Sequence, residues 1–199
     1  MRILAFSDLH HARSRARDLV AASEGADLVI GAGDFCNMRQ DLGGALDLLR
    51  DIAAPMIVVP GNAESAEELR AAALPGMRVL HGEAAEHAGL RLYGLGYAVP
   101  ETPFGGWSCD LSEAEAGRML AGCAAADILI LHSPPKDLAD RTSQGLSIGS
   151  TAIRDAIARI QPRLALCGHV HDSWGQRGRI GRTEVVNLGP RPNWFELRP

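Results

Sequence analysis

The chain has 199 residues, of which 46% are apolar and 22% charged, and its formal net charge is -4. This composition is typical of a globular protein and excludes the broad basic surface that non-specific nucleic-acid binding needs. The length fits one domain over residues 1–199, large enough to bury a core without disulfides or a structural metal.

The cysteines and the N-terminal residues predict a cellular compartment. The 4 cysteines are widely spaced and include no C-x-x-C pair, as is typical of a reduced intracellular protein. Residues 1–6 lead directly into the polar pair Ser7-Asp8, so the apolar stretch of a signal peptide is missing. Apolar runs as long as a membrane span, about 20 residues, are also missing. We therefore expect a cytoplasmic protein with no membrane partner.

Short apolar runs alternate along the chain with stretches of helical periodicity. The apolar runs have the length of strands buried on both faces, and they cover residues 3–6, 28–30, 56–59, 128–131 and 164–166. The helical stretches are rich in Ala, Leu, Glu and Arg, and they cover about 14–24, 41–53, 65–73, 112–123 and 149–160. This alternation predicts an α/β fold.

Two regions, 77–94 and 174–198, interrupt the alternation with brief β-like pieces. They predict antiparallel or mixed strands at 78–80, 90–93, 183–188 and 194–197. Exposed apolar strands in 183–198 could pair between subunits, so a homo-oligomer is one possible assembly. Two Gly/Pro-rich stretches, 94–107 and 133–147, are expected to be long loops, which in compact domains often have functional roles.

Each predicted buried strand is followed closely by residue types that bind metal ions. The carboxyl ends of parallel strands border the ligand crevice of an α/β sheet, so these side chains are expected to converge. Taken singly, each has an ordinary structural explanation, such as a turn, a helix cap or a hydrogen-bonded histidine. Their ordered combination predicts a metal site formed by Asp8, His10, Asp34, Asn62, His132, His169 and His171.

The mixture of ligand types indicates which ions the site would bind. Carboxylate and imidazole together suit Mn, Fe, Zn or Co, whereas Mg or Ca sites consist almost wholly of oxygen. One catalytic zinc ion takes about three protein ligands and a water, fewer than this sequence offers. The ligand set therefore favours two ions that share one carboxylate, about 3.5–4 Å apart.

As an ordered set, these motifs resemble the calcineurin-like metallophosphoesterase superfamily. Its pattern is Asp-x-His, Gly-Asp, Gly-Asn-His-(Asp/Glu), a His and Gly-His-x-His, and the match extends over residues 3–190. The short chain resembles the small bacterial and archaeal phosphoesterases of the superfamily. This resemblance implies a four-layer αββα sandwich of two mixed β-sheets. It also implies one ion held by Asp8, His10, Asp34 and His171, and a second held by Asp34, Asn62, His132 and His169.

The resemblance further implies a dinuclear phosphoesterase in which Asp34 bridges the ions and a bridging hydroxide attacks phosphorus in line. Asp34, Asn62 and His132 are the expected catalytic residues. Two divalent ions are expected, with manganese favoured and iron, zinc, nickel or cobalt as alternatives. The expected partner is a small or nucleotide-like phosphoester, and nucleic acid is not expected.

The sequence departs from the family pattern at Ala63, where the superfamily usually has histidine. In the superfamily that imidazole helps to protonate the leaving group or to stabilise the transition state, and general acid catalysis contributes about 10²–10⁴-fold. Its absence favours a phosphodiesterase, or activated esters, over a phosphomonoesterase. His11 could replace it, or could be an ordinary surface histidine. Glu64 matches the acidic position of the pattern and is otherwise an acid at a helix N-terminus.

Other residues suggest contacts with the substrate, each with a simpler explanation. Arg13 and Arg17 are one helical turn apart and could bind a phosphate, or form a solvated helix face. Segment 102–107 could cover the site, with Phe104 or Trp107 stacking on an aromatic group, or it could pack against the domain. Cys36 could approach a metal or be a small buried residue.

Three other functions compete with a phosphodiesterase. A phosphomonoesterase or protein phosphatase is disfavoured by Ala63 and by the short chain. A nuclease would need a basic groove, which the net charge of -4 does not indicate. A non-catalytic metal-binding scaffold of the same fold would be expected to lose ligands, whereas every ligand position is filled here.

Overall fold

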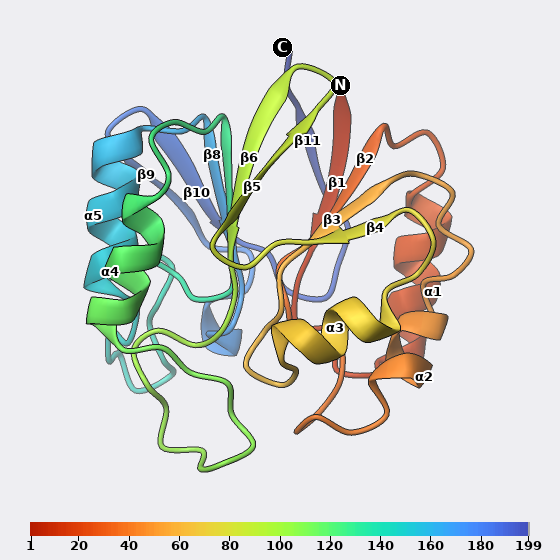
Figure 1. Cartoon of the computed structure of the whole chain (residues 1–199), viewed down its shortest axis with the longest axis horizontal. Coiled ribbons are helices and arrows are strands. Elements are labelled where there is room, and N and C mark those ends of the chain that lie inside the picture. Colours follow the sequence, from red (N-terminus) through yellow and green to blue (C-terminus); the bar gives the residue numbers. More distant parts are fainter. Residues whose placement is uncertain (199) are drawn as a thin grey trace.

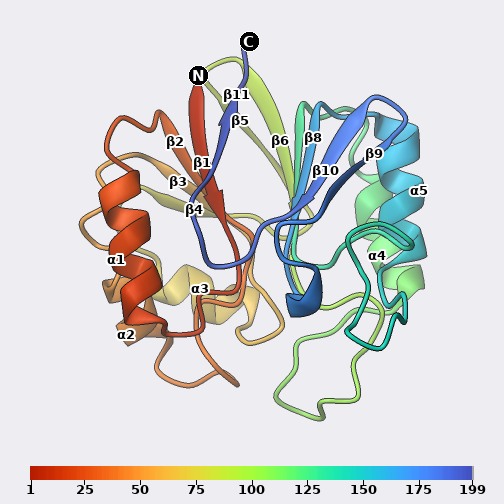
Figure 2. The same cartoon turned by 180° about the vertical axis from the view of Figure 1, so that it is seen from behind.

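The computed structural model describes residues 1–198 as two β-sheets packed face to face between two layers of helices (Figure 1). Helices α1 (Arg13–Ala22), α2 (Leu42–Asp47) and α3 (Ala66–Ala72) lie beside one sheet. Helices α4 (Glu113–Ala121) and α5 (Thr151–Ile160) cover the other, as the view from behind also shows (Figure 2). The predicted αββα sandwich is confirmed.

The first sheet has the strand order β11-β1-β2-β3-β4. Neighbouring strands from β1 to β4 are parallel, whereas β11 pairs antiparallel with β1, so the sheet is mixed and the end of β11 lies beside the start of β1 (Figure 1). Its strands are β1 (Arg2–Phe6), β2 (Leu28–Gly31), β3 (Met56–Val58), β4 (Met77–Val79) and β11 (Asn193–Glu196).

The second sheet has the order β5-β6-β7-β8-β10-β9. Its four inner strands are parallel, and the two edge strands, β5 and β9, are antiparallel to their neighbours. The strands are β5 (Glu83–His87), β6 (Leu90–Leu95), β7 (Ile128–Leu131), β8 (Leu164–Cys167), β9 (Arg177–Ile180) and β10 (Thr183–Asn187).

Successive side chains along a strand point to opposite faces of its sheet and therefore belong to separate core layers. In β1, Ile3 and Ala5 belong to the core between the sheets, whereas Leu4 and Phe6 pack in the core beneath α1 and α2. A third core lies between the second sheet and helices α4 and α5. Because both faces of each sheet are covered, strands β2, β3, β7 and β8 are fully buried apolar runs, as expected from the sequence, whereas β6 and β10 also carry the polar residues Arg91 and Glu184.

Edge strands β5 and β9 are absent from the sequence predictions, and one helix is shorter than predicted. Strand β5 consists of Glu, Ala and His, which do not favour strands, but it pairs along its length with β6 and buries Ala85. Helix α2 ends at Asp47 instead of continuing to 53, and Gly43 and Gly44 lower its helix propensity. Within residues 1–198, no helix has the length and apolarity needed to cross a bilayer.

Candidate metal centre

The residues predicted to bind metal lie where the parallel strands end. Asp8, Asp34 and Asn62 follow β1, β2 and β3 of the first sheet. His132 directly follows β7 of the second sheet, and the pair His169 and His171 follows β8. The candidate centre therefore takes ligands from both sheets.

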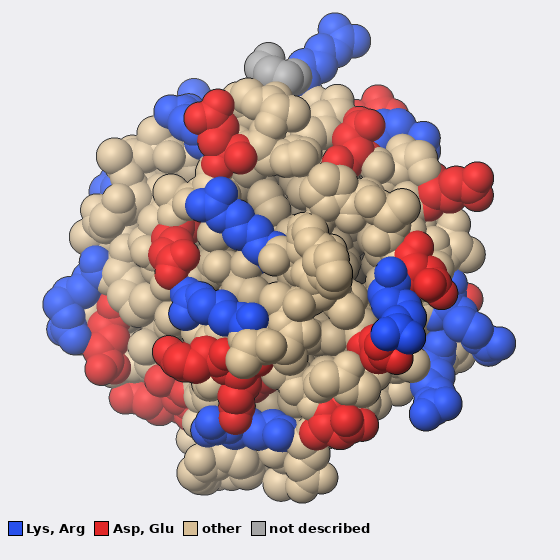
Figure 3. Space-filling model, turned by 45° about the vertical axis from the view of Figure 1, so that its right-hand side comes forward, with Lys and Arg blue, Asp and Glu red and all other residues tan. Residues whose placement is uncertain are grey.

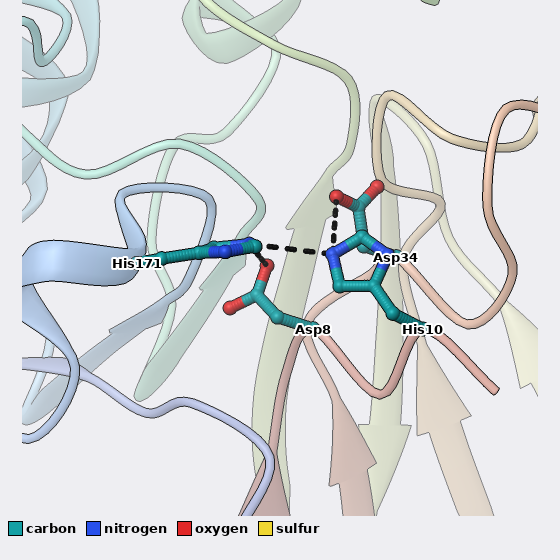
Figure 4. Close-up of side chains that lie close together, drawn as sticks. All are labelled: Asp8, His10, Asp34 and His171. Carbon is teal, nitrogen blue, oxygen red and sulfur yellow. Dashed lines mark hydrogen bonds and ion pairs between the residues drawn. The ribbon is translucent and has the colours of Figure 1, made fainter. Parts of the chain in front are cut away.

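One cluster consists of Asp8, His10, Asp34 and His171, each with a potential ligand atom within 4.8 Å of the others. These side chains point toward one another (Figure 4). His10 Nε2 lies 3.4 Å from Asp34 Oδ2 and 3.3 Å from His171 Nε2, and the latter atom lies 3.9 Å from Asp8 Oδ1. Two imidazole nitrogens and two carboxylates that face a common point suit a divalent cation.

A second cluster is formed by Asp34, His132 and His169, whose ligand atoms also lie within 4.8 Å of one another. Asn62 Oδ1 completes it, at 3.1 Å from both His132 Nε2 and His169 Nδ1. Asp34 belongs to both clusters: Oδ2 faces His10, whereas Oδ1 lies 3.6 Å from His132 Nε2. This shared carboxylate is in the position that a bridging ligand requires.

The backbone that carries these ligands is strained. Asp8, His10, Asp34 and His169 have positive φ angles of 54°, 46°, 58° and 66°. The left-handed conformation is unfavourable by about 1–2 kcal/mol for each non-glycine residue, and such strain concentrates at functional sites. The loops also pack closely, because a Cβ atom at Gly61 would collide with the Asp34 carboxylate.

Backbone carbonyls fix the orientation of two histidines. His10 Nδ1 donates to the carbonyl of Cys36 at 3.0 Å, and His132 Nδ1 donates to the carbonyl of Ala32 at 2.8 Å. Since a carbonyl can only accept, Nδ1 carries the proton, and the lone pair of Nε2 is directed to the centre.

Burial and nearby charges determine the protonation of the imidazoles. Burial, aided by nearby His132, lowers the pKa of His169 to about 3, and burial lowers the pKa of His171. Both are therefore neutral ligands near pH 7. Burial also acts to lower the pKa of His132, but the carboxylates of Asp34 and Asp8 outweigh it and the pKa is raised. A cation that binds here competes with a proton on His132.

Glu64 joins two ligand-bearing loops from within the fold. Its fully buried carboxylate accepts hydrogen bonds from the backbone N–H groups of Gly61 at 2.7 Å, Asp34 at 2.8 Å and Phe35 at 3.1 Å. Burial, together with the charge of Asp34, raises the pKa of Glu64 to about 7. Helix α3 has Ser65 as its N-cap, so the interpretation of Glu64 as a helix N-terminal acid is wrong.

The Asn62 amide is oriented by a loop that sequence reasoning did not connect with the centre. Its Nδ2 donates to Ser108 Oγ at 3.0 Å, and this hydroxyl donates to Asp110 Oδ1 at 2.6 Å. The N–H of Cys109 also donates to the Asn62 carbonyl at 2.9 Å. These contacts direct Asn62 Oδ1 toward His132 and His169. No local motif marks Ser108, because its role depends on how the loop folds back.

We expect Ser108→Ala to weaken binding of the second metal ion by about 10–100-fold, the usual effect of losing an outer hydrogen-bond partner of a ligand. Without the hydroxyl acceptor, the Asn62 amide can rotate and present its NH₂ group to the ion. Calorimetric titration of metal-free protein measures both affinities. Ser108→Thr retains the hydroxyl and should restore binding, and Ser143→Ala, at an exposed loop position, is the matched control. Equal affinities in wild type and Ser108→Ala would refute this role.

A cavity of about 310 Å³ opens over the ligands. Phe104 and Trp107 line it, consistent with the prediction that segment 102–107 covers the site, and so does Ala63. His11 does not belong to the described lining, and its Nε2 lies 3.1 Å from the carbonyl oxygen of Gln40. His11 therefore does not occupy the place of the missing family histidine.

The other residues singled out in the sequence have structural roles or lie outside this cavity. Cys36 is buried, and its Sγ donates to the Ala63 carbonyl at 3.0 Å. Burial and the charge of Glu64 raise the pKa of this thiol, which therefore stays protonated and is a poor metal ligand. Arg13 and Arg17 are exposed on α1, and neither belongs to the described cavity lining.

Comparisons with known proteins agree with this architecture. A family model described as the calcineurin-like phosphoesterase superfamily domain matches residues 1–196. None of the curated proteins matches the chain.

Several solved structures share the fold. Protein TT1561 of Thermus thermophilus has a TM-score of 0.74 and 21% identity, and the match covers 99% of each chain. A dimetal phosphatase from Danio rerio has a TM-score of 0.65 and 14% identity over 96% of this chain and 88% of its own. An archaeal phosphodiesterase has a TM-score of 0.54 and 15% identity over 95% and 84%.

Proposed function

The chain belongs to the calcineurin-like phosphoesterase superfamily, and on this basis we propose that it is a dinuclear phosphodiesterase acting on a small or nucleotide-like phosphoester. The observation that carries the proposal is the pair of ligand clusters that share Asp34. Two divalent ions, when bound, would activate water and neutralise charge on the phosphoryl oxygens. The complete set of candidate ligands favours an enzyme over a non-catalytic scaffold.

The residues of the chain have distinct roles in this proposal. Asp34 would hold both ions, and Asn62 and His132 would bind the second ion through atoms that other groups have already oriented. Such preorganisation avoids rearrangement of ligands as charge develops on the phosphoryl group. His169, neutral at pH 7, needs no deprotonation before it binds.

The preference for diesters or activated esters rests on Ala63. Among the described residues that line the metal cavity, every titratable side chain is a candidate metal ligand. The cavity thus offers no free acid to protonate a poor leaving group, which disfavours ordinary phosphomonoesters. The fold itself does not discriminate between the two activities, because both the archaeal phosphodiesterase and the dimetal phosphatase share it.

A small-molecule substrate is favoured over nucleic acid. Lys and Arg side chains are interspersed with Asp and Glu on the face seen in Figure 3, which shows no continuous basic surface. The net charge of -4 acts in the same direction. We propose manganese as the supporting ion, with iron, zinc, nickel or cobalt as alternatives, and a cytoplasmic location.

The proposal is tested by turnover of bis-p-nitrophenyl phosphate and p-nitrophenyl phosphate after reconstitution with Mn, Ni, Co, Zn or Mg. We expect the diester to be the better substrate and Mn to support turnover. Absence of diester turnover with every ion, although two ions bind per chain, would contradict the proposal. A monoester preference would contradict its diesterase part.

We expect Ala63→His to raise turnover of monoesters with poor leaving groups by about 10²-fold, because the imidazole supplies the missing general acid. The Ala63 side chain lines the metal cavity, so a longer side chain would extend over the ions. Initial rates with phenyl phosphate measure the gain. Ala63→Gln is the matched control, since it is of similar size but its amide cannot transfer a proton to the leaving group. An equal gain in both variants would rule out acid catalysis.

A further inference from the structure

Most of the large apolar side chains that are exposed in residues 1–198 lie at or next to the metal cavity, and Trp194 on β11 is the exception. Met38, Phe104 and Ile148 are 52%, 50% and 41% exposed, and all three line the cavity. Leu146, 59% exposed, precedes Ile148 in the same loop. Concentrated apolar exposure at a concave site indicates a binding surface.

A second cavity of about 500 Å³ continues from the first. Phe104, Ile148 and the candidate ligand His169 line both cavities. Segments 100–104 and 147–149 also line the second cavity. The first of these belongs to the long loop between β6 and α4, which projects beyond the sheets (Figure 1). Together the cavities form one groove, which leads away from the metal centre.

The groove contains little positive charge. Lys136 is the one lysine or arginine among the described residues that line either cavity, and its Nζ donates to the Ser147 carbonyl at 2.6 Å. A substrate with several phosphates, or a nucleic-acid strand, would need more cations along its path. The groove therefore favours an occupant without charge.

We propose that the groove binds an uncharged, apolar organic substituent of the phosphoester, with Phe104 and Ile148 as its main contacts, while the phosphate lies at the metal centre. This inference rests on the proposed function and narrows it to phosphodiesters with one negative charge and an apolar alkyl or aryl group. The continuity of the two cavities at His169 places such a group within reach of the ligands.

Binding of alkylphosphonates to the metal-loaded protein tests the groove without requiring turnover. Each molecule has one phosphonate for the metal centre and one apolar group. Burying a methylene strengthens binding by about fourfold, so full burial of the additional methylenes of hexylphosphonate should strengthen its binding by about 10³-fold relative to methylphosphonate. Phenylphosphonate, measured alongside, distinguishes a preference for rings from one for chains.

Phe104→Ser and Ile148→Ser should each reduce the ratio of hexyl to methyl affinities by about 5–10-fold. Leu146→Ser is the matched control, because this exposed leucine lies outside the described lining of both cavities. Equal affinities for the two phosphonates, or an unchanged ratio in both lining variants, would overturn the proposal. So would adenosine monophosphate binding more tightly than hexylphosphonate in wild type and in both variants.

The two proposals fail in different ways. Loss of the chain-length effect while bis-p-nitrophenyl phosphate is still hydrolysed would reject the groove and retain the phosphodiesterase. A strong chain-length effect without diester turnover would retain the groove and reject the phosphodiesterase. Absence of binding by every phosphonate, hexylphosphonate included, would reject the phosphate position at the metal centre, and with it both proposals.

Discussion

Replacing Asp34 with asparagine is expected to reduce phosphodiester turnover by at least about 10³-fold, because one carboxylate serves both ligand clusters. Asparagine keeps the shape of the side chain and can still accept the N–H of Ala63, which donates to Asp34 Oδ1 at 2.8 Å. It removes the negative charge and one of the two oxygens that face the ions. The fold should therefore persist while the pairing of the ions is lost.

Initial rates with bis-p-nitrophenyl phosphate measure the loss of turnover, and elemental analysis measures the number of metal ions bound per chain. We expect metal content to fall from two ions per chain to one or none. Asp51→Asn, which removes an exposed carboxylate between α2 and β3, is the matched control and should behave as wild type. Two tightly bound ions with undiminished turnover in Asp34→Asn would exclude Asp34 as the bridge.

The second large effect is expected at Glu64, where Glu64→Ala should lower the free energy of unfolding by about 3–5 kcal/mol. The substitution leaves the buried N–H groups of Gly61, Asp34 and Phe35 without their acceptor. Relief of the buried charge offsets part of this loss. Since the two loops that Glu64 joins carry the candidate ligands Asp34 and Asn62, metal affinity should also fall.

Urea unfolding of the metal-free protein measures the stability change. Glu67→Ala, at an exposed position in the first turn of α3, is the matched control and should change stability by less than about 1 kcal/mol. Glu64→Gln keeps one carbonyl acceptor and should have an intermediate effect. Equal stabilities of Glu64→Ala and Glu67→Ala would contradict the proposed stabilising role of the Glu64 carboxylate between the two loops.

The raised pKa of Glu64 also predicts how stability varies with pH. The folded metal-free protein holds the Glu64 proton up to about pH 7, whereas the unfolded chain releases it near the ordinary value of 4.5. Between these values the folded state binds more protons, so the contribution of Glu64 to stability falls as pH rises. Glu64→Gln should reduce the fall in the free energy of unfolding between about pH 4.5 and pH 7. An unchanged pH dependence in this variant would show that a group other than Glu64 causes the fall.

The inner strands and the order of the ligands were predictable from the amino-acid sequence alone. Strands β2, β3, β7 and β8 are buried on both faces, so their own residues must be apolar, and a run such as 128–131 is recognisable without its neighbours. Asp34 and His132 directly or closely follow such runs, and parallel pairing alone is enough to bring strand ends to one edge. Local pattern and general topology therefore predicted the α/β class and the candidate ligands, whereas the two-sheet sandwich was implied by the resemblance to the superfamily.

Features that depend on contacts between distant segments became visible only in the folded chain. Strand β5 exists because β6 pairs with it, not because Glu and Ala favour a strand. Ser108 reaches Asn62, 46 positions away, and Glu64 reaches the backbone of Asp34, 30 positions away. Their hydrogen-bond partners lie on other loops, and a sequence does not state how loops meet. The orientation of each ligand and the shape of the apolar groove thus follow from loop packing. Loop packing depends on contacts between residues far apart in the sequence, so a local sequence pattern does not predict it.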